Sequence, residues 1–169
     1  MQAAHESGHV LAALLTGGEI ATIVLHPLKI SHTEMIDNPH PLVVVLAGPL
    51  VGVLLPLVLW GLLAVTGTPG AFLARFFAGF CLIANGAYLG VGSFLGTGDC
   101  GEMLRQGSYI WVLRLFGAVA VPLGFWLWNG QGPNFGLGPA HGKVNHRVAY
   151  ASLVLCSLLV LLGLIVDGA

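Results

Sequence analysis

Long apolar runs, separated by short clusters of glycine, proline and polar residues, dominate the chain. Four of these runs are long enough for a helix to cross the roughly 30 Å hydrocarbon core of a bilayer. They cover residues 41–65, 71–95, 109–128 and about 148–166. The pattern therefore predicts a polytopic membrane protein in which helices cross the bilayer several times.

Two shorter segments precede these runs. Residues 3–15 form an apolar helix of roughly 20 Å, too short to cross by itself. It either enters tilted or partway, or residues are missing upstream of Met1, and we favour missing residues. Residues 19–31 are rich in β-branched side chains and contain Pro27, which predicts a strand or hairpin. A polar loop is expected over residues 31–41.

The expected fold is thus an all-α polytopic membrane protein with about five hydrophobic helices and a short β hairpin or strand region after the first. The sequence shows no convincing internal repeat and no second domain, so we expect a single domain over residues 1–169.

Composition supports a bilayer as the solvent. Hydrophobic residues make up 56% of the chain and charged residues 8%, whereas soluble domains carry about 25% charged residues. We expect a multi-pass protein of the cell membrane, with the lipid bilayer as a partner. The formal net charge of −1 argues against a nucleic-acid partner. The three cysteines form no CxxC pair and no disulfide framework.

The pentapeptide HESGH near the start of the chain carries the first candidate chemistry. On a helix His5 and His9 project from one face, and Glu6 lies beside them. This is the HExxH arrangement, in which two imidazoles bind zinc and the glutamate acts as general base. The alternative is a polar cluster at the headgroup boundary. Because the motif leads directly into an apolar helix, where polar residues tend to be functional, we favour a metal site.

A catalytic zinc normally has three protein ligands, so a third must come from elsewhere. Asp99 stands out because it follows an apolar run and glycines flank it in GTGDCG, which allows an irregular backbone. Its alternative role is to cap the following helix, and on its own position we favour the cap. The candidates for the third ligand are His26, His32, His40, Asp99, Cys100, Glu102, His141 and His146.

Three motifs in order give the chain a family resemblance. HESGH, then LAGPL in the second apolar run, then GDCGEML after the third, resembles the site-2 protease family of intramembrane zinc metallopeptidases, especially its compact prokaryotic-type members. The resemblance covers residues 1 to about 107. It implies that His5, His9 and Asp99 hold Zn²⁺ and that Glu6 is the catalytic base.

The chain departs from that family at two positions. Gly52 stands where the family often has an asparagine three residues after the proline, and Cys100 stands where a glycine usually follows the aspartate. Asn85, inside the third apolar run, is a possible substitute for the asparagine, although an interhelical hydrogen bond is the favoured role. Cys100 remains a possible soft ligand.

The leading hypothesis is an intramembrane zinc metalloendopeptidase that cleaves peptide bonds in or near transmembrane segments of membrane proteins. Residues 19–31 would pair with the unwound substrate as an added strand. One alternative is a catalytically inactive scaffold or regulatory protein that keeps the metal. Another is a metal transporter, which the almost wholly apolar later spans disfavour. We interpret the remaining histidines as interfacial or loop residues.

Overall fold

Helices make up most of the fold, and a two-stranded hairpin follows the first of them. The computed structural model describes residues 1–25 and 30–167. Its elements in chain order are α1 (Gln2–Thr16), β1 (Glu19–Val24), β2 (His32–Asp37), α2 (Pro41–Val65), α3 (Ala71–Leu95), α4 (Gly98–Arg105), α5 (Ile110–Trp128), the 3₁₀ turns η1 (Gly132–Phe135) and η2 (Gly138–Ala140), and α6 (His146–Asp167).

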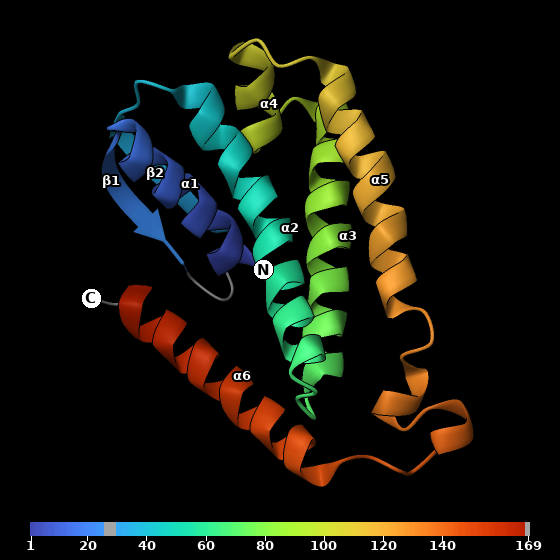
Figure 1. The fold of residues 1–169 in the computed structure, drawn as a ribbon. Helices are drawn as coiled ribbons and strands as arrows, with labels where there is room; N and C mark the ends of the chain where they lie inside the picture. The colour runs from blue at the N-terminus through green and yellow to red at the C-terminus, as the bar shows by residue number, and fades with distance from the viewer. Residues whose placement is uncertain (26–29, 168–169) are drawn as a thin grey trace.

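Among the described residues, four helices are long and apolar enough to cross a membrane: α2, α3, α5 and α6. The protein is therefore a multi-pass membrane protein, and all four predicted spans are confirmed to within two residues at each end. In Figure 1, α2, α3 and α5 stand side by side in a row, while α6 runs obliquely apart from them. No residue of the α6 segment His146–Ile165 is buried.

Small residues let the row of spans pack closely. A Cβ added at Gly117 of α5 would lie 2.7 Å from the carbonyl oxygen of Gly86 in α3 and 2.8 Å from the Cα of Gly90. Backbones can approach this closely only where side chains are absent, which is the usual basis of helix packing in a bilayer. The close packing of α3 and α5 gives α3 a rigid position behind the site described below.

The hairpin lies beside α1 at one side of the row (Figure 1). Its strands pair antiparallel, from Glu19 opposite Asp37 to Val24 opposite His32. The predicted strand or hairpin after the first helix is confirmed, but its second strand occupies part of the predicted polar loop. Thr33 and Met35 of β2 face inward, and Met35 packs with Ile20 on the cluster formed by α1 and α2. A strand this polar shows almost no apolar alternation, so its sequence looks like a loop.

Candidate metal centre

Helices α1 and α2 approach closely at the HESGH motif. A Cβ added at Gly8 would lie 2.3 Å from the carbonyl oxygen of Ala47 in α2, so only glycine fits there. Gly8 thus leaves room for the backbone of α2. His5, Glu6 and His9 of α1 are all buried: the two histidines face α2, and Glu6 faces the hairpin region. Burial of three ionisable groups together requires that each has a partner.

The structure brings His5, His9 and Asp99 into one cluster. The distance from His5 Nε2 to Asp99 Oδ2 is 2.8 Å, from His9 Nε2 to the same oxygen 3.5 Å, and between the two Nε2 atoms 3.1 Å. Ligands of a tetrahedral zinc site at about 2.0–2.1 Å from the ion are separated by roughly 3.3 Å. The three atoms therefore stand close to the corners of such a tetrahedron, and the cluster can hold a metal ion.

Both imidazole rings are held by their other nitrogen. His9 Nδ1 lies 2.8 Å from the carbonyl oxygen of Val44, which can only accept, so this nitrogen carries the proton. His5 Nδ1 lies 2.8 Å from Asn85 Oδ1. When each ring is neutral and protonated at Nδ1, its Nε2 presents a lone pair toward the carboxylate oxygen of Asp99. A cation between the three groups would bind these lone pairs and the carboxylate oxygen. Histidines that bind a metal usually have their other ring nitrogen hydrogen-bonded in this way.

Helix α4 brings Asp99 to the cluster. Its N-cap is Thr97, and Gly98 has a φ of 58°, a backbone conformation that favours glycine. The backbone N–H of Asp99 donates to the hydroxyl of Tyr88 at 3.0 Å. Asp99 is therefore inside the first turn with its carboxylate directed at His5, and the favoured role as helix cap was wrong.

The charge of Asp99 also follows from its surroundings. Burial by itself raises the pKa of this carboxyl, but the contacts with the rings of His5 and His9 outweigh that effect and hold the pKa well below its usual range. The group is thus a carboxylate at neutral pH. Asp99 therefore brings one negative charge to the cluster that it forms with His5 and His9.

Glu6 is held separately, by the hairpin region. The hydroxyl of Ser31 donates to one carboxylate oxygen at 2.8 Å, and the hydroxyl of Thr33 in β2 donates to the other at 2.7 Å. Glu6 is only 4% exposed, so these two hydrogen bonds replace much of its hydration. The sequence analysis missed Ser31 and Thr33. Their hydroxyls adjoin the predicted strand, but nothing in the sequence pairs them with Glu6.

Helix α2 leaves space for the imidazoles at the Gly-Pro motif. A Cβ added at Gly48 would lie 2.3 Å from Cε1 and Nε2 of His9 and 3.0 Å from Nε2 of His5. The motif LAGPL therefore has a direct steric relation to HESGH, because any side chain at residue 48 would occupy the place of the histidine rings. The order of motifs noted in the sequence reflects contact in space.

The cluster opens into a cleft of about 700 Å³ between α1, the hairpin, α2, α3 and α4. Ile30, Thr33 and Met35 line it on the hairpin side, and Tyr88 and Glu102 on the side of α3 and α4. The cleft is largely apolar except around the cluster and Glu6. This volume has room for a short extended peptide beside the cluster.

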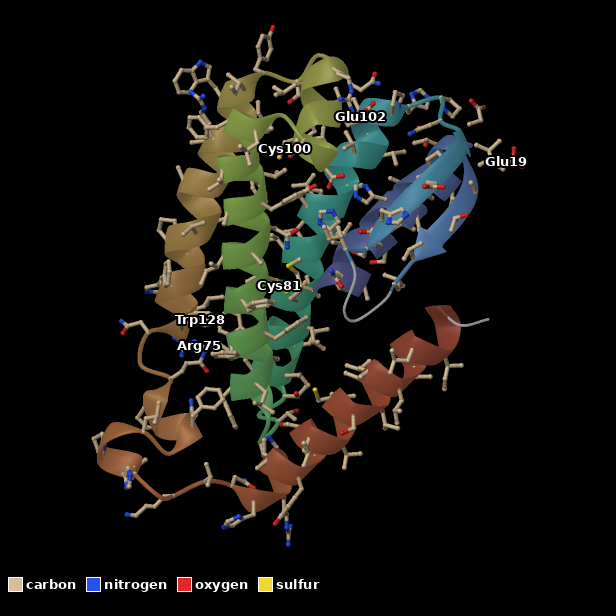
Figure 2. All side chains as sticks on the ribbon, turned by 180° about the vertical axis from the view of Figure 1, so that it is seen from behind. Glu19, Arg75, Cys81, Cys100, Glu102 and Trp128 are labelled. Atoms are coloured by element: carbon tan, nitrogen blue, oxygen red, sulfur yellow. The ribbon has the colours of Figure 1, made fainter. Side chains whose placement is uncertain are left out.

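Among the residues that the structure describes, the remaining candidates for the third ligand lie outside the cluster. Cys100 is buried with its Sγ toward the carbonyl oxygens of Tyr88 and Leu89, and burial raises the pKa of its thiol to about 11. Glu102, labelled in Figure 2, lines the cleft, but its carboxylate binds Arg105 and Gln106. His26 lies outside the described residues. The other histidines are exposed, namely His32, His40, His141 and His146.

Fold and site together define a multi-pass membrane protein with a metallopeptidase motif at the contact of its first two helices. Residues 1–96 match the Peptidase M50B-like family. The chain therefore belongs to this family, which is related to the site-2 proteases and consists of intramembrane metallopeptidases. Asp99 lies just beyond the matched residues. Comparisons with curated proteins and with solved structures found no match.

Proposed function

We propose that the protein is an intramembrane zinc metalloendopeptidase that hydrolyses peptide bonds in or near transmembrane segments of other membrane proteins. The observation that carries this proposal is the convergence of two imidazole nitrogens and a carboxylate oxygen beside a separately held glutamate, at the wall of a cleft. Family membership supports the same class of reaction. The three convergent groups are the donor set of a catalytic zinc site with one open position.

His5, His9 and Asp99 are the proposed zinc ligands. When bound, a zinc ion supplies a Lewis acid that polarises the scissile carbonyl and lowers the pKa of a water molecule to about 7. With one carboxylate and two neutral rings, the ligand set leaves a net positive charge at the site. The hydrogen bonds to Val44 and Asn85 keep both rings in the tautomer that such a site needs.

Glu6 is the proposed general base. It accepts the proton of the attacking water and then delivers it to the leaving amine. A carboxylate offers about four lone-pair positions, so the hydroxyls of Ser31 and Thr33 orient the group and still leave positions for the water. Because these two residues come from the hairpin region, the hairpin takes part in positioning the base.

The substrate segment is proposed to bind in the cleft in extended form. A transmembrane helix hides its carbonyls in its own hydrogen bonds, so local unwinding must precede attack. The hairpin has only two strands, and an unwound segment would add to it by pairing along the edge that faces the cleft. Helix α5 packs along α3 behind the cleft, which supports joining α5 to the motif-bearing helices in one domain, whereas the inclusion of α6 stays a prediction.

The two departures from the family do not remove this chemistry. The amide of Asn85 lies beside Gly52, as described below, and the Sγ of Cys100 fills space that a Cβ at Gly92 would otherwise occupy, at 2.5 Å. Neither departure removes a ligand or the base. This favours an active enzyme over a scaffold that only retains the metal.

The test is cleavage by the purified full chain in liposomes, with and without Glu6→Gln. The probe is a panel of synthetic transmembrane peptides with glycine and proline at varied depth, which eases unwinding. We expect the wild type to cleave members of the panel. Glu6→Gln should cleave none while holding the same amount of zinc. Undiminished cleavage by Glu6→Gln would overturn the role of the base. A zinc-loaded wild type that cleaves no peptide would favour the inactive scaffold.

A further inference from the structure

Asn85 is a polar residue in the middle of an apolar span, and it is only 1% exposed. A buried amide in this setting needs hydrogen-bond partners. Its partners are His5, at 2.8 Å from Nδ1 to Oδ1, and the carbonyl oxygen of Cys81 one turn earlier in α3, at 2.9 Å from Nδ2. We propose that Asn85 is a positioning residue that sets the tautomer and the ring orientation of His5 for metal binding. This inference rests on the proposed function.

The partners fix which way the amide points. The carbonyl oxygen of Cys81 can only accept, so the NH₂ group of Asn85 must face it. The amide oxygen then faces His5, whose Nδ1 must donate. Protonation at Nδ1 leaves the lone pair of His5 on Nε2, the atom that lies 2.8 Å from Asp99. One buried amide thereby determines which nitrogen of His5 is available to a metal.

The two histidines differ in how they are held. His9 donates to a backbone carbonyl, that of Val44, which no substitution can delete. His5 depends on a side chain from a helix that is distant in the sequence. The outer partner of a histidine ligand tunes the basicity of the ring and its orientation, and its loss typically costs about 10- to 100-fold in metal affinity.

Helix α2 leaves space for the amide of Asn85 at Gly52. A Cβ added at Gly52 would lie 3.0 Å from Oδ1 and 3.1 Å from Nδ2 of Asn85. Residue 52 is also the position where the resembled family often has an asparagine. The space that a side chain at residue 52 would enter is thus filled by an amide that comes from α3. An asparagine at residue 52 would carry its amide into the same region once Asn85 is removed.

The experiment compares zinc affinity in the detergent-purified full chain, measured by competition with a chromophoric chelator. Asn85→Ala is expected to weaken zinc binding about 10- to 100-fold. The double variant Asn85→Ala with Gly52→Asn should recover at least part of that loss. Ser93→Ala is the matched control, because Ser93 is also buried in α3 but donates to Gly90 of its own helix. It should stay within about twofold of the wild type, since it contacts no metal ligand.

A second readout follows the tautomer itself. In protein labelled with ¹⁵N-histidine, the His5 signal should show a protonated Nδ1 in the wild type and a shift toward the other tautomer in Asn85→Ala. A merely structural amide would not change this signal. If Asn85→Ala does not fold, Asn85→Leu decides, since it keeps the volume of the side chain but offers His5 no acceptor. A folded Asn85→Leu should lose about 10- to 100-fold in zinc affinity, and wild-type affinity in this variant would overturn the role of Asn85.

The outcomes separate this inference from the proposed function. A wild type that binds no zinc refutes the metal site as a whole. A wild type that binds zinc, with Asn85→Ala equal to it in affinity and in the His5 signal, overturns only the role of Asn85. In that case the amide serves only to join α1 to α3.

Discussion

Gly48→Ala is the substitution for which the structure gives the clearest magnitude. The added Cβ would lie 2.3 Å from Cε1 and Nε2 of His9, where ordinary contact begins at 3.4 Å. The ring of His9 must therefore retreat by about 1 Å, because the backbones of α1 and α2 are already in contact. Ligand distances in metal sites lie within about 0.2 Å of their usual values, so a shift of this size takes His9 out of the range for a ligand.

The cost of such overpacking is about 1–3 kcal/mol. Because the folded metal-free protein can release the strain by turning His9 away, most of the cost should appear in metal binding. Since about 1.4 kcal/mol corresponds to a factor of ten, zinc affinity should fall about 5- to 150-fold. The drop in thermal stability without zinc should be small by comparison.

The assay is chelator competition in detergent, with Gly61→Ala as the control. Gly61 lies in the same helix, and a Cβ there meets nothing within 4 Å. This control should keep wild-type zinc affinity and gain slightly in helix stability. Gly48→Ala with the zinc affinity of the wild type would refute the placement of the histidine rings against α2.

Two further predictions follow from contacts around the cluster. The double variant Ser31→Ala with Thr33→Val should lower kcat/KM about 10- to 100-fold at unchanged zinc affinity, because Glu6 loses both orienting hydroxyls. The exposed Thr22→Val is its control, and full activity of the double variant would contradict the role of the hairpin. Cys100→Gly should lower the free energy of unfolding by about 2 kcal/mol, through lost packing and a helical glycine, with zinc retained. Thermal unfolding in detergent measures this, and a tenfold loss of zinc would show that Sγ contributes to the site.

Much of the fold was predictable because the bilayer imposes a simple rule. A spanning helix needs about 20 apolar residues, so α2, α3, α5 and α6 stand out by length and composition. The second strand did not stand out. Its side chains are mostly polar, and only Met35 and Thr33 turn toward the rest of the protein. Pairing with β1 forms this strand, and a single sequence carries little sign of that pairing.

The candidate site, like the fold, has residues that the local sequence predicts and one that it does not. His5, Glu6 and His9 are neighbours on one helix, so their spacing predicts their common face. Asp99 is 94 residues from His5, and only the ordered motifs of the resembled family single it out from the other candidates. On local evidence it looks like a helix cap, since an aspartate before a short helix usually is one.

The hydrogen bonds that hold Glu6 and His5 in place could not be predicted from local sequence patterns. Ser31 and Thr33 reach Glu6 only because the hairpin folds back on α1, and Asn85 reaches His5 only because α3 stands where it does. The sequence analysis favoured an interhelical hydrogen bond for Asn85, and this is confirmed. Its partner could not be predicted, because any polar group within reach would have served.

The most direct test of the central claim is the zinc content of the detergent-purified full chain, compared among the wild type, His5→Ala and Asp99→Ala. The account predicts about one zinc ion per chain in the wild type and little in either variant, since a catalytic zinc needs three protein ligands. Zinc that persists in a folded Asp99→Ala at the wild-type level would contradict the three-ligand site. Its absence from the wild type would contradict the metallopeptidase proposal itself.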